Sequence, residues 1–594
     1  MFVFLFFLSH FWDAGLCNCQ DCLLAVFFLL KLQYMKNTCK QCGVGFQISE
    51  EDLKFYDKVS PVISGKKFLV SPPTLCPDCR LQRRLVWRNE RGLYRRKCSK
   101  TGKEMISWIS PDKPYKVYTN DVWWGDNWDA LDYGREFDFS RPFFDQFKEL
   151  IEEVPWLGLL IDKVTNSDFV NFCLNVKNCY LTYGSNNNED SMYSSYLTHC
   201  EDCVDVLHGD DCQLCYDSVD LVKCYSCKYS VRCNNCSDLL FCENCQNCRN
   251  CFGCVNLVAK EYHFLNESLS KAEYESKIKS LDLGAYSKVR DVKKGFLKYR
   301  LEFPKKYANI LNCENCSGDS LSNSKNVHDS YDVIGAEDCR WIILGHGGIK
   351  DCYDSNGIED LELCYETVTN GAPTSRILFS TYIWKGVHNV LYSVLSPAST
   401  DCFGVMGLHR GKYCILNKQY TKEEYEALVP RIIEHMRKTG EWGEFFPADL
   451  SPFSYNETSA LDYYPLSRED ALKKGFKWSD VSRDVNADNA IEVSKLPDDI
   501  SDVDDNILDK VIKCELTGRS FKINSKELAY YRMYNVPLPH FHPDQRYVER
   551  MKLRNSHKLC DRKCDKCSAE IRSTYKPDRL EPVYCEKCYQ EEVY

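Results

Sequence analysis

The sequence predicts a mixed α+β multidomain protein, in which zinc-ribbon or treble-clef modules at both ends flank a duplicated β-solenoid with capping helices. Three observations support this fold class. Most of the 36 cysteines in the 594-residue chain fall in Cys-x-x-Cys pairs, the spacing that lets two thiolates reach one tetrahedral ion. The middle of the chain repeats short strand-like units separated by Asn, Asp, Gly and Ser. The two ends resemble each other, and so do the two middle segments.

The first 34 residues contain two apolar runs, and neither reaches the roughly 20 residues of a membrane-spanning helix. Zinc-type motifs begin directly after Met35, so we expect Met35 to be the initiator and residues 1–34 to be an apolar extension that is not translated. The alternative is a weak membrane anchor. The long chain has a net charge of −10 and no convincing export signal, which favours reduced thiols and a cytoplasmic location over a disulfide framework.

Residues 35–122 are predicted to form the first zinc-finger module. Its candidate ligands are two Cys-x-x-Cys pairs separated by a hairpin-like insert, and the second pair lies at the mouth of a helix, whose dipole favours thiolate. These ligands are Cys39, Cys42, Cys76 and Cys79.

Residues 510–594 are predicted to form the second module, after an acidic linker over residues 478–509. CPDCRLQRRLVWRNERGLYRRKC near the start matches HPDQRYVERMKLRNSHKLCDRKC near the end without a gap, so a module of two successive fingers was duplicated. We therefore expect the two modules to pack together as a pseudo-symmetric pair. The candidate ligands of the second module are Cys564, Cys567, Cys585 and Cys588.

The two copies of the module have lost complementary sets of cysteines. The N-terminal copy has Thr101, Thr119 and Val122 where its second finger would need ligands, and the C-terminal copy has Thr517, His542 and Gln545 in its first finger. Because an incomplete tetrahedron holds zinc poorly, each complete set of four should act as one unit. The sequence therefore predicts two structural Zn²⁺ ions.

Between the modules, we expect an aromatic-rich connector over residues 123–165 and two solenoid copies over residues 166–300 and 301–477. AKEYHFLNESLSKAEYE of the first copy recurs as RGKYCILNKQYTKEEYE in the second. Both have capping-box spacing, from Ser270 to Glu273 and from Thr421 to Glu424, which predicts a capping helix in each copy.

The central cysteines have two interpretations. The run CENCQNCRNCFGC could hold further zinc or an iron–sulfur cluster. At the matched positions, however, the second copy has Ser393, Ser396, Ser399 and Val405, and it retains only Cys402. A fold that tolerates Ser and Val there does not depend on metal, which favours cysteine as a small packing residue.

A basic stripe in the first module suggests a nucleic-acid contact. Arg80, Arg84 and Arg88 recur every fourth residue, and Trp87 lies among them, so a helix would present cations to phosphates and a ring to a base. The alternative is that the stripe pairs with acidic residues of the same chain, for example those at 498–505.

The leading function is a binding or scaffold protein with a nucleic acid or a protein as candidate partner. The alternative is a carbohydrate-active β-helix enzyme that uses solenoid aspartates. Those residues are Asp205, Asp217, Asp351 and Asp354, and no motif assigns any residue a catalytic role.

Two resemblances accompany these motifs. CKQCGVGF, FY and PTLCPDCR resemble the pattern of probable zinc-ribbon domains. Residues 35–594 as a whole resemble a family of uncharacterised cysteine-rich bacterial proteins, through DYGREFDFSRPFF, GEWGEFFP and VYCEKCYQEEVY among other strings. The resemblance implies a shared architecture and no established activity.

Overall fold

The computed structural model describes residues 34–371, 373–481 and 489–593. The expectations for residues 1–33, including whether they are translated, lie outside this range. The mixed helix and strand content is confirmed, with a cysteine cluster near each end that could bind metal. Among the described helices, none combines the length and the apolar character that crossing a membrane requires.

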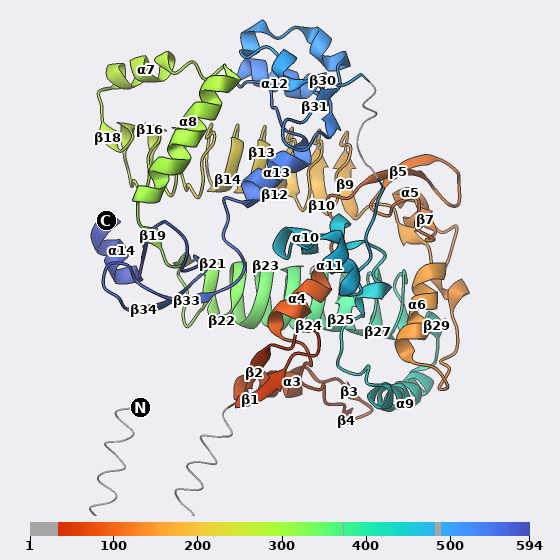
Figure 1. Ribbon diagram of the computed structural model, residues 1–594. Coiled ribbons are helices and arrows are strands. Elements are labelled where there is room, and N and C mark those ends of the chain that lie inside the picture. The colour runs from red at the N-terminus through yellow and green to blue at the C-terminus, as the bar shows by residue number, and fades with distance from the viewer. Residues whose placement is uncertain (1–33, 372, 482–488, 594) are drawn as a thin grey trace, which may run out of the picture.

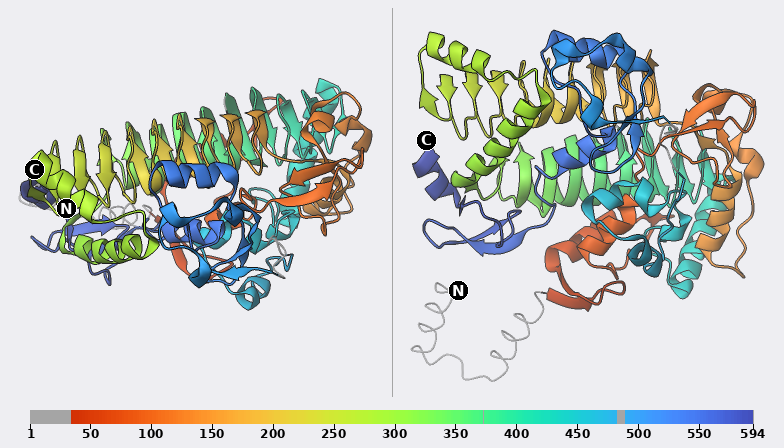
Figure 2. Two further views of the ribbon diagram at one scale, coloured as in Figure 1. Left: turned by 90° about the horizontal axis from the view of Figure 1, so that it is seen from above. Right: turned by 45° about the horizontal axis from the view of Figure 1, so that its top comes forward.

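Two rows of mostly parallel strands, most of them short, form the centre of the molecule and lie beside each other (Figures 1 and 2). The first row contains β9 (Ile161–Thr165), β10 (Cys173–Lys177), β11 (Asn186–Glu189), β12 (Ser195–Thr198), β13 (Val204–Asp210), β14 (Tyr216–Val222), β15 (Ser237–Leu240), β16 (Arg249–Phe252) and β17 (Glu261–Phe264). The second row contains β20 (Ile310–Leu311), β21 (Gly318–Ser322), β22 (Lys325–His328), β23 (Ser330–Glu359), β24 (Leu361–Asn370), β25 (Thr374–Thr381), β26 (Val387–Leu391), β27 (Thr400–Phe403) and β28 (Lys412–Ile415).

Neighbouring strands in a row pair at a spacing of 12 residues over most of both rows. Val204 pairs with Tyr216 in the first row, and His388 pairs with Thr400 in the second. The chain turns by entering the left-handed region at every third residue along much of each row, as at Asp202 (φ 50°) and Asp205 (φ 58°). Asn and Asp tolerate this conformation best among residues with a side chain, which explains why they recur in the repeated units.

The residue that follows such a turn is buried in the interior of the row. Cys215 follows Leu214 in the first row, and its Sγ donates to the carbonyl of Cys224 at 3.7 Å. In the second row, buried Ser396 follows Leu395 and donates to the carbonyl of Val405 at 3.5 Å. Thiol and hydroxyl therefore make the same hydrogen bond, to the carbonyl nine residues further along the chain.

Each row ends in a short hairpin and a helix. The hairpins are completed by β18 (Glu267–Ser268) and β29 (Lys418–Gln419), and the helices are α7 (Lys271–Ser280) and α9 (Lys422–Thr439). Ser270 and Thr421 both accept the N3 amide in a capping box, so the predicted helix starts are confirmed. The first row continues into α8 (Tyr286–Tyr299).

The end modules are built from four small antiparallel hairpins. They are β1 (Tyr34–Thr38) with β2 (Gly45–Ser49), β5 (Tyr94–Lys97) with β6 (Glu104–Ser107), β31 (Ile512–Lys513) with β32 (Ser520–Phe521), and β33 (Cys560–Lys563) with β34 (Glu570–Ser573). Helices α3 (Glu50–Val59) and α12 (Ser525–Met533) follow the first hairpin of each module, and both begin with a capping box. The matched elements agree with the duplication seen in the sequence.

The modules dock crosswise on the two rows. Helix α4 (Pro77–Leu85) of the first module lies on β23 and β24 of the second row, whereas α13 (Pro543–Met551) of the second module lies on β13 and β14 of the first row (Figure 1). Ion pairs such as Arg91 to Asp544, at 2.9 Å, also join the modules. Each end module thus docks on one of the rows and also contacts the other module, whereas their pseudo-symmetric pairing stays a prediction.

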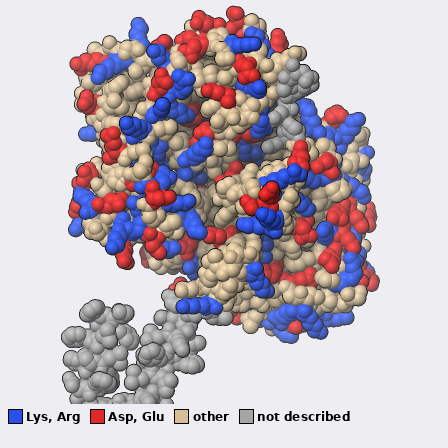
Figure 3. Space-filling model, in the orientation of Figure 1, with Lys and Arg blue, Asp and Glu red and all other residues tan. Residues whose placement is uncertain are grey.

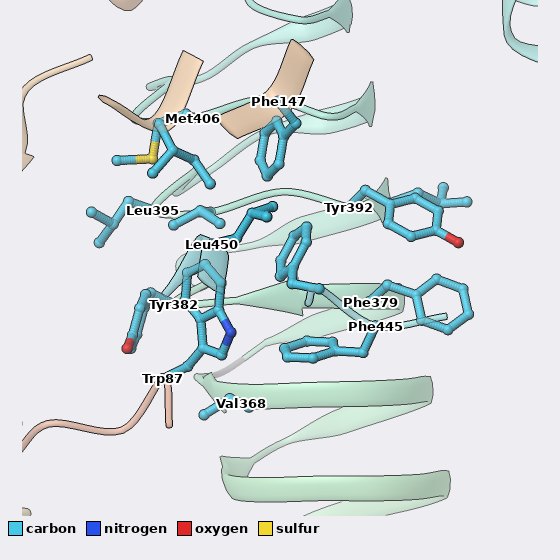
Figure 4. Packing of buried hydrophobic residues seen from close by; sticks show 14 of the residues in the cluster. Trp87, Phe147, Val368, Phe379, Tyr382, Tyr392, Leu395, Met406, Phe445 and Leu450 are labelled. Atoms are coloured by element: carbon cyan, nitrogen blue, oxygen red, sulfur yellow. The ribbon is translucent and has the colours of Figure 1, made fainter. Parts of the chain in front are cut away.

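The remaining elements extend these contacts. Strand β7 (Val117–Tyr118) pairs with β8 (Trp156–Leu157) before the first row, and β35 (Val583–Tyr584) pairs with β19 (Lys305–Lys306) before the second. Other short elements are β3 (Val62–Ile63), β4 (Lys66–Lys67), α5 (Asn120–Trp124), α6 (Phe143–Glu153), α10 (Ser459–Tyr463), α11 (Arg468–Lys473), β30 (Ile491–Glu492) and α14 (Glu586–Val593). A large aromatic core joins α4, α6 and the second row, with Trp87 packed beside Phe445 (Figure 4).

Candidate metal centres

The first four-cysteine cluster joins a hairpin turn to a helix start. Cys39 follows β1 and Cys42 lies in the turn before β2, while Cys76 is the N-cap of α4 and Cys79 lies in its first turn. The four Sγ atoms all lie within 4.8 Å of one another, and Cys42 Sγ is 3.7 Å from Cys76 Sγ. The structure thus brings together all four ligands proposed from the sequence for this module.

The second cluster has the same construction. Cys564 follows β33 and Cys567 lies in the turn before β34, while Cys585 directly precedes α14 and Cys588 lies in that helix. Their Sγ atoms are also within 4.8 Å of one another, with 3.7 Å between Cys567 and Cys585. The Cys585 amide donates to Cys564 Sγ at 3.2 Å, a bond that favours a thiolate at Cys564.

In both clusters, the four thiols can all ionise only if a cation compensates their charge. A hydrogen bond from the Cys79 thiol lowers the pKa of Cys76 to about 5, and the same contact raises the pKa of Cys79. In the second cluster, burial opposes ionisation of Cys564, but the backbone amides of Cys585 and Cys567 lower its pKa to about 6. Four thiolates this close repel one another unless a metal ion neutralises them.

One turn geometry recurs in all four hairpins. At Cys39, the amide donates to the carbonyl five residues ahead and the carbonyl accepts from the amide four residues ahead, and the same two bonds occur at Cys98, Cys514 and Cys564. The fourth residue after each cysteine has a positive φ, between 61° and 73°. The turns at Cys98 and Cys514 therefore have the same backbone geometry as the turns of the two clusters, although other residues occupy the positions of the remaining ligands.

Hydroxyl groups replace the missing thiols around Cys98. Its Sγ is 3.9 Å from Thr119 Oγ1. Burial raises the pKa of the Cys98 thiol, but bonds from the Thr101 hydroxyl and from the backbone amides of Thr119 and Thr101 lower it to about 7. Hydrogen bonds to the Cys98 sulfur therefore stand where the second finger of the first module lacks further thiols.

A third group of potential ligands was not expected from the sequence. His199, Asp210 and Asp211 have ligand atoms within 4.8 Å of one another, at an exposed to half-buried surface of the first row. The 12-residue strand spacing places His199 beside Asp211, so this spacing is the signal that could have revealed the group. Within the described residues, the central cysteines form no group of three with all Sγ atoms that close.

The prediction that the arginine stripe is exposed and free to contact a nucleic acid is wrong. Arg80, Arg84 and Arg88 are at most 5% exposed and Trp87 is 0% exposed. Arg80 Nη2 and Arg84 Nη1 bind Asp354 at 2.9 and 3.0 Å, and Arg88 pairs with Glu90. The stripe faces the second row because carboxylates there compensate the buried charge. Intramolecular pairing was the alternative, although the acidic partners are not those at 498–505.

The aspartates considered for carbohydrate chemistry also have ionic partners. Asp354 binds Arg80 and Arg84, as described. Asp205 accepts from Arg550 Nη1 at 2.7 Å, Asp217 from Lys293 Nζ at 2.6 Å, and Asp351 from Lys58 Nζ at 2.6 Å. Asp205 and Asp354 are at most 1% exposed. These contacts use the carboxylates to attach the modules and α8 to the rows. On the face in Figure 3, cationic and anionic side chains are interspersed.

Comparisons with known proteins do not assign a family. No protein-family model matches the chain, and no curated protein matches it. Among solved structures, a match is found to a crystal structure described as a "putative acetyltransferase" from Desulfovibrio desulfuricans G20. It shares 9% identity, covers 47% of this chain and 81% of that chain, and has a TM-score of 0.09. With so low a TM-score, this match does not bear on fold or function.

Proposed function

We propose that the protein is a zinc-binding scaffold, in which two metal-stabilised end modules clamp two copies of a β-solenoid. The observation that carries the proposal is the pair of closed four-cysteine clusters. Four sulfur ligands with no place kept for water or substrate are typical of structural zinc, whereas catalytic zinc has three protein ligands and an open position. Each cluster would hold one Zn²⁺ ion.

The strand spacing supports the solenoid part of the proposal. Parallel pairing at 12 residues, with a left-handed turn at every third residue, describes a coil of four short sides. Each coil would contact only its neighbours, so stacking would build one continuous interior. As part of the proposal we keep the domain division expected from the sequence, with modules over residues 35–122 and 510–594 around a connector and two solenoid copies.

The ionic contacts support a scaffold rather than a nucleic-acid reader. Arginines of α4 and α13 form ion pairs with buried carboxylates of the rows. A side chain held in this way cannot also neutralise a phosphate. The proposal therefore has no nucleic-acid partner at this stripe. A reducing, cytoplasmic setting fits the proposal, because the zinc ligands must be thiolates and not disulfides.

Elemental analysis of the reduced full-length protein tests the zinc assignment. We expect two zinc ions per chain, and Cys567→Ser should leave one, because three ligands hold structural zinc poorly. Cys98→Ser is the matched control, since Cys98 lies in the same turn geometry without three further thiols. That variant should retain two zinc ions.

A second measurement tests the clamping role. Chelation of zinc should expose cleavage sites in the end modules to a protease while the two rows stay resistant. Zinc content of zero in the freshly purified reduced protein, or protease resistance that does not depend on metal, would overturn the proposal.

A further inference from the structure

The first row contains a continuous set of interacting thiols. All thirteen cysteines between Cys200 and Cys254 interact with at least one neighbour, and the contacts join them without a break. We call this set the thiol network. Its members are at most 3% exposed. None of its members belongs to either four-cysteine cluster, and the proposed zinc scaffold does not use them.

The 12-residue spacing of the row builds the network. Cys200, Cys212, Cys224, Cys236 and Cys248 follow one another at that spacing, so successive coils stack their thiols in one column. The Cys212 thiol, for example, interacts with those of Cys200 and Cys224 in its column and with Cys215 beside it.

The fold does not require sulfur at these positions. At the places that match Cys242, Cys245 and Cys248, the second row has Ser393, Ser396 and Ser399, all 0% exposed. Ser399 donates to the carbonyl of Leu408 at 3.2 Å, and the equivalent Cys248 donates to the carbonyl of Leu257 at 3.4 Å. Packing and hydrogen bonding are thus satisfied by serine, so the density of thiols in the first row exceeds what the architecture needs.

We propose that the thiol network binds soft monovalent d¹⁰ ions, Cu(I) or Ag(I), as a chain of ions bridged by thiolates. Soft thiolate ligands select Cu(I). The described central cysteines include no three Sγ atoms mutually within 4.8 Å, so three- and four-coordinate sites are not preformed, whereas pairs of neighbouring thiols are abundant. Two sulfur neighbours are enough for these ions.

When ions bind to the thiol network, the interior stays neutral and its carbonyl groups stay hydrogen-bonded. Each ion that enters replaces one thiol proton, which leaves to solvent, so a chain with one cation per thiolate stays neutral in the low-dielectric interior. The carbonyls that lose an S–H donor keep a second one. The carbonyl of Cys254, which accepts from Cys245 Sγ at 3.6 Å, also accepts the Glu243 amide at 2.9 Å.

The network ends close to the surface at the last coils of the row. Cys251 pairs in register with His263 of β17, which is half-buried, and the Cys251 thiol donates to the carbonyl of exposed Lys260. His263 Nδ1 lies 2.8 Å from the Glu261 carbonyl, which leaves Nε2 available to pass an ion inward. Ions would enter at this end and fill the columns in sequence.

The test loads the reduced full-length protein with Cu(I) under anaerobic conditions, supplied as a complex with a competing chelator, and measures copper per chain after desalting. At about one ion per thiolate, the wild type should retain roughly ten or more copper ions. Cys212→Ser, Cys224→Ser and Cys236→Ser combined should retain at least three fewer. The control is Cys173→Ser with Cys179→Ser, two buried thiols of the same row outside the network, which should retain as much as the wild type.

Both four-cysteine clusters are intact in all three proteins, so copper that displaces zinc there cancels in the comparison. Equal copper in the wild type and the triple variant would overturn the proposal. X-ray absorption on the wild type gives a readout that does not depend on whether the variant folds. We expect most copper to have two sulfur neighbours, and copper found only with three or four would reject the bridged chain.

Discussion

Arg84 Nη1 lies 2.9 Å from Glu366 Oε2, although 282 residues separate the two in the sequence and both side chains are buried. The second module repeats this relationship on the other row, where Arg550 Nη1 lies 2.7 Å from Asp205 Oδ1. Because α4 docks on the second row and α13 on the first, the two contacts fasten opposite ends of the chain to opposite halves of the centre.

Loss of the Arg84 guanidinium should destabilise the protein strongly. Arg84→Met keeps most of the side-chain volume but leaves Glu366 and Asp354 with less compensating charge in a buried site. Removal of one partner of a buried pair costs about 3 to 5 kcal/mol. Urea unfolding should show a loss of that size in the free energy of unfolding.

The matched control is an exposed pair. Arg437 Nη1 lies 2.8 Å from Glu434 Oε1 on α9, and both side chains are more than a third exposed. Arg437→Met should change the free energy of unfolding by less than about 0.5 kcal/mol. A loss of similar size in both variants would contradict the clamping role of Arg84.

Gly357 gives a second test of the same interface. A Cβ at this position would lie 1.9 Å from Arg88 Nη1, and the residue has a φ of +61°. Gly347 has the same φ, and a Cβ there would meet no heavy atom within 4 Å, so Gly347→Ala isolates the backbone cost, about 1 kcal/mol. Gly357→Ala should lose at least about 2 kcal/mol more, because Arg88 is buried and paired. Equal thermal shifts in the two variants would show that Arg88 moves freely.

The sequence predicted the elements that local patterns encode. Both sets of four cysteines and both capping boxes are local features, and the internal duplications supplied controls for them. The burial of Arg80 could not be predicted because its partner Asp354 is distant in the chain. The left-handed turn at every third residue could not be predicted either. Asn and Asp favour this conformation, but residues such as Phe169 and Tyr193 also adopt it here, so the residue types do not mark every turn.

Three substitutions should restore a metal site in the first module. Thr101→Cys, Thr119→Cys and Val122→Cys together place thiols where the C-terminal copy has ligands, and Cys98 and its turn are already in place. The variant should bind three zinc ions per chain by elemental analysis instead of two. The control variant with only Thr101→Cys and Thr119→Cys supplies three ligands and should stay near two. Two ions in the full variant would mean that the turn has diverged too far to hold metal.

Protonation of His409 should weaken the fold at mildly acidic pH. The ring lies among indoles, with its centroid 4.2 Å from Trp123 and 5.0 Å from Trp124, and its Nε2 is buried without a hydrogen-bond partner. Burial lowers the pKa of His409 to about 4. The negative charge of Asp129 acts against this shift, whereas the positive charges of Arg410 and Lys385 add to it.

The sign of the effect follows from linkage. Because the pKa is lower in the folded state than the usual 6.5 of the unfolded chain, the unfolded state binds more protons between these values. Stability is therefore complete above about pH 6.5 and falls as the pH decreases toward 4. His409→Phe keeps the ring and removes the proton site, so its free energy of unfolding should fall less over this range than that of the wild type, by about 2 kcal/mol. If the stability of His409→Phe falls as steeply between pH 6.5 and 4 as that of the wild type, His409 does not carry this dependence.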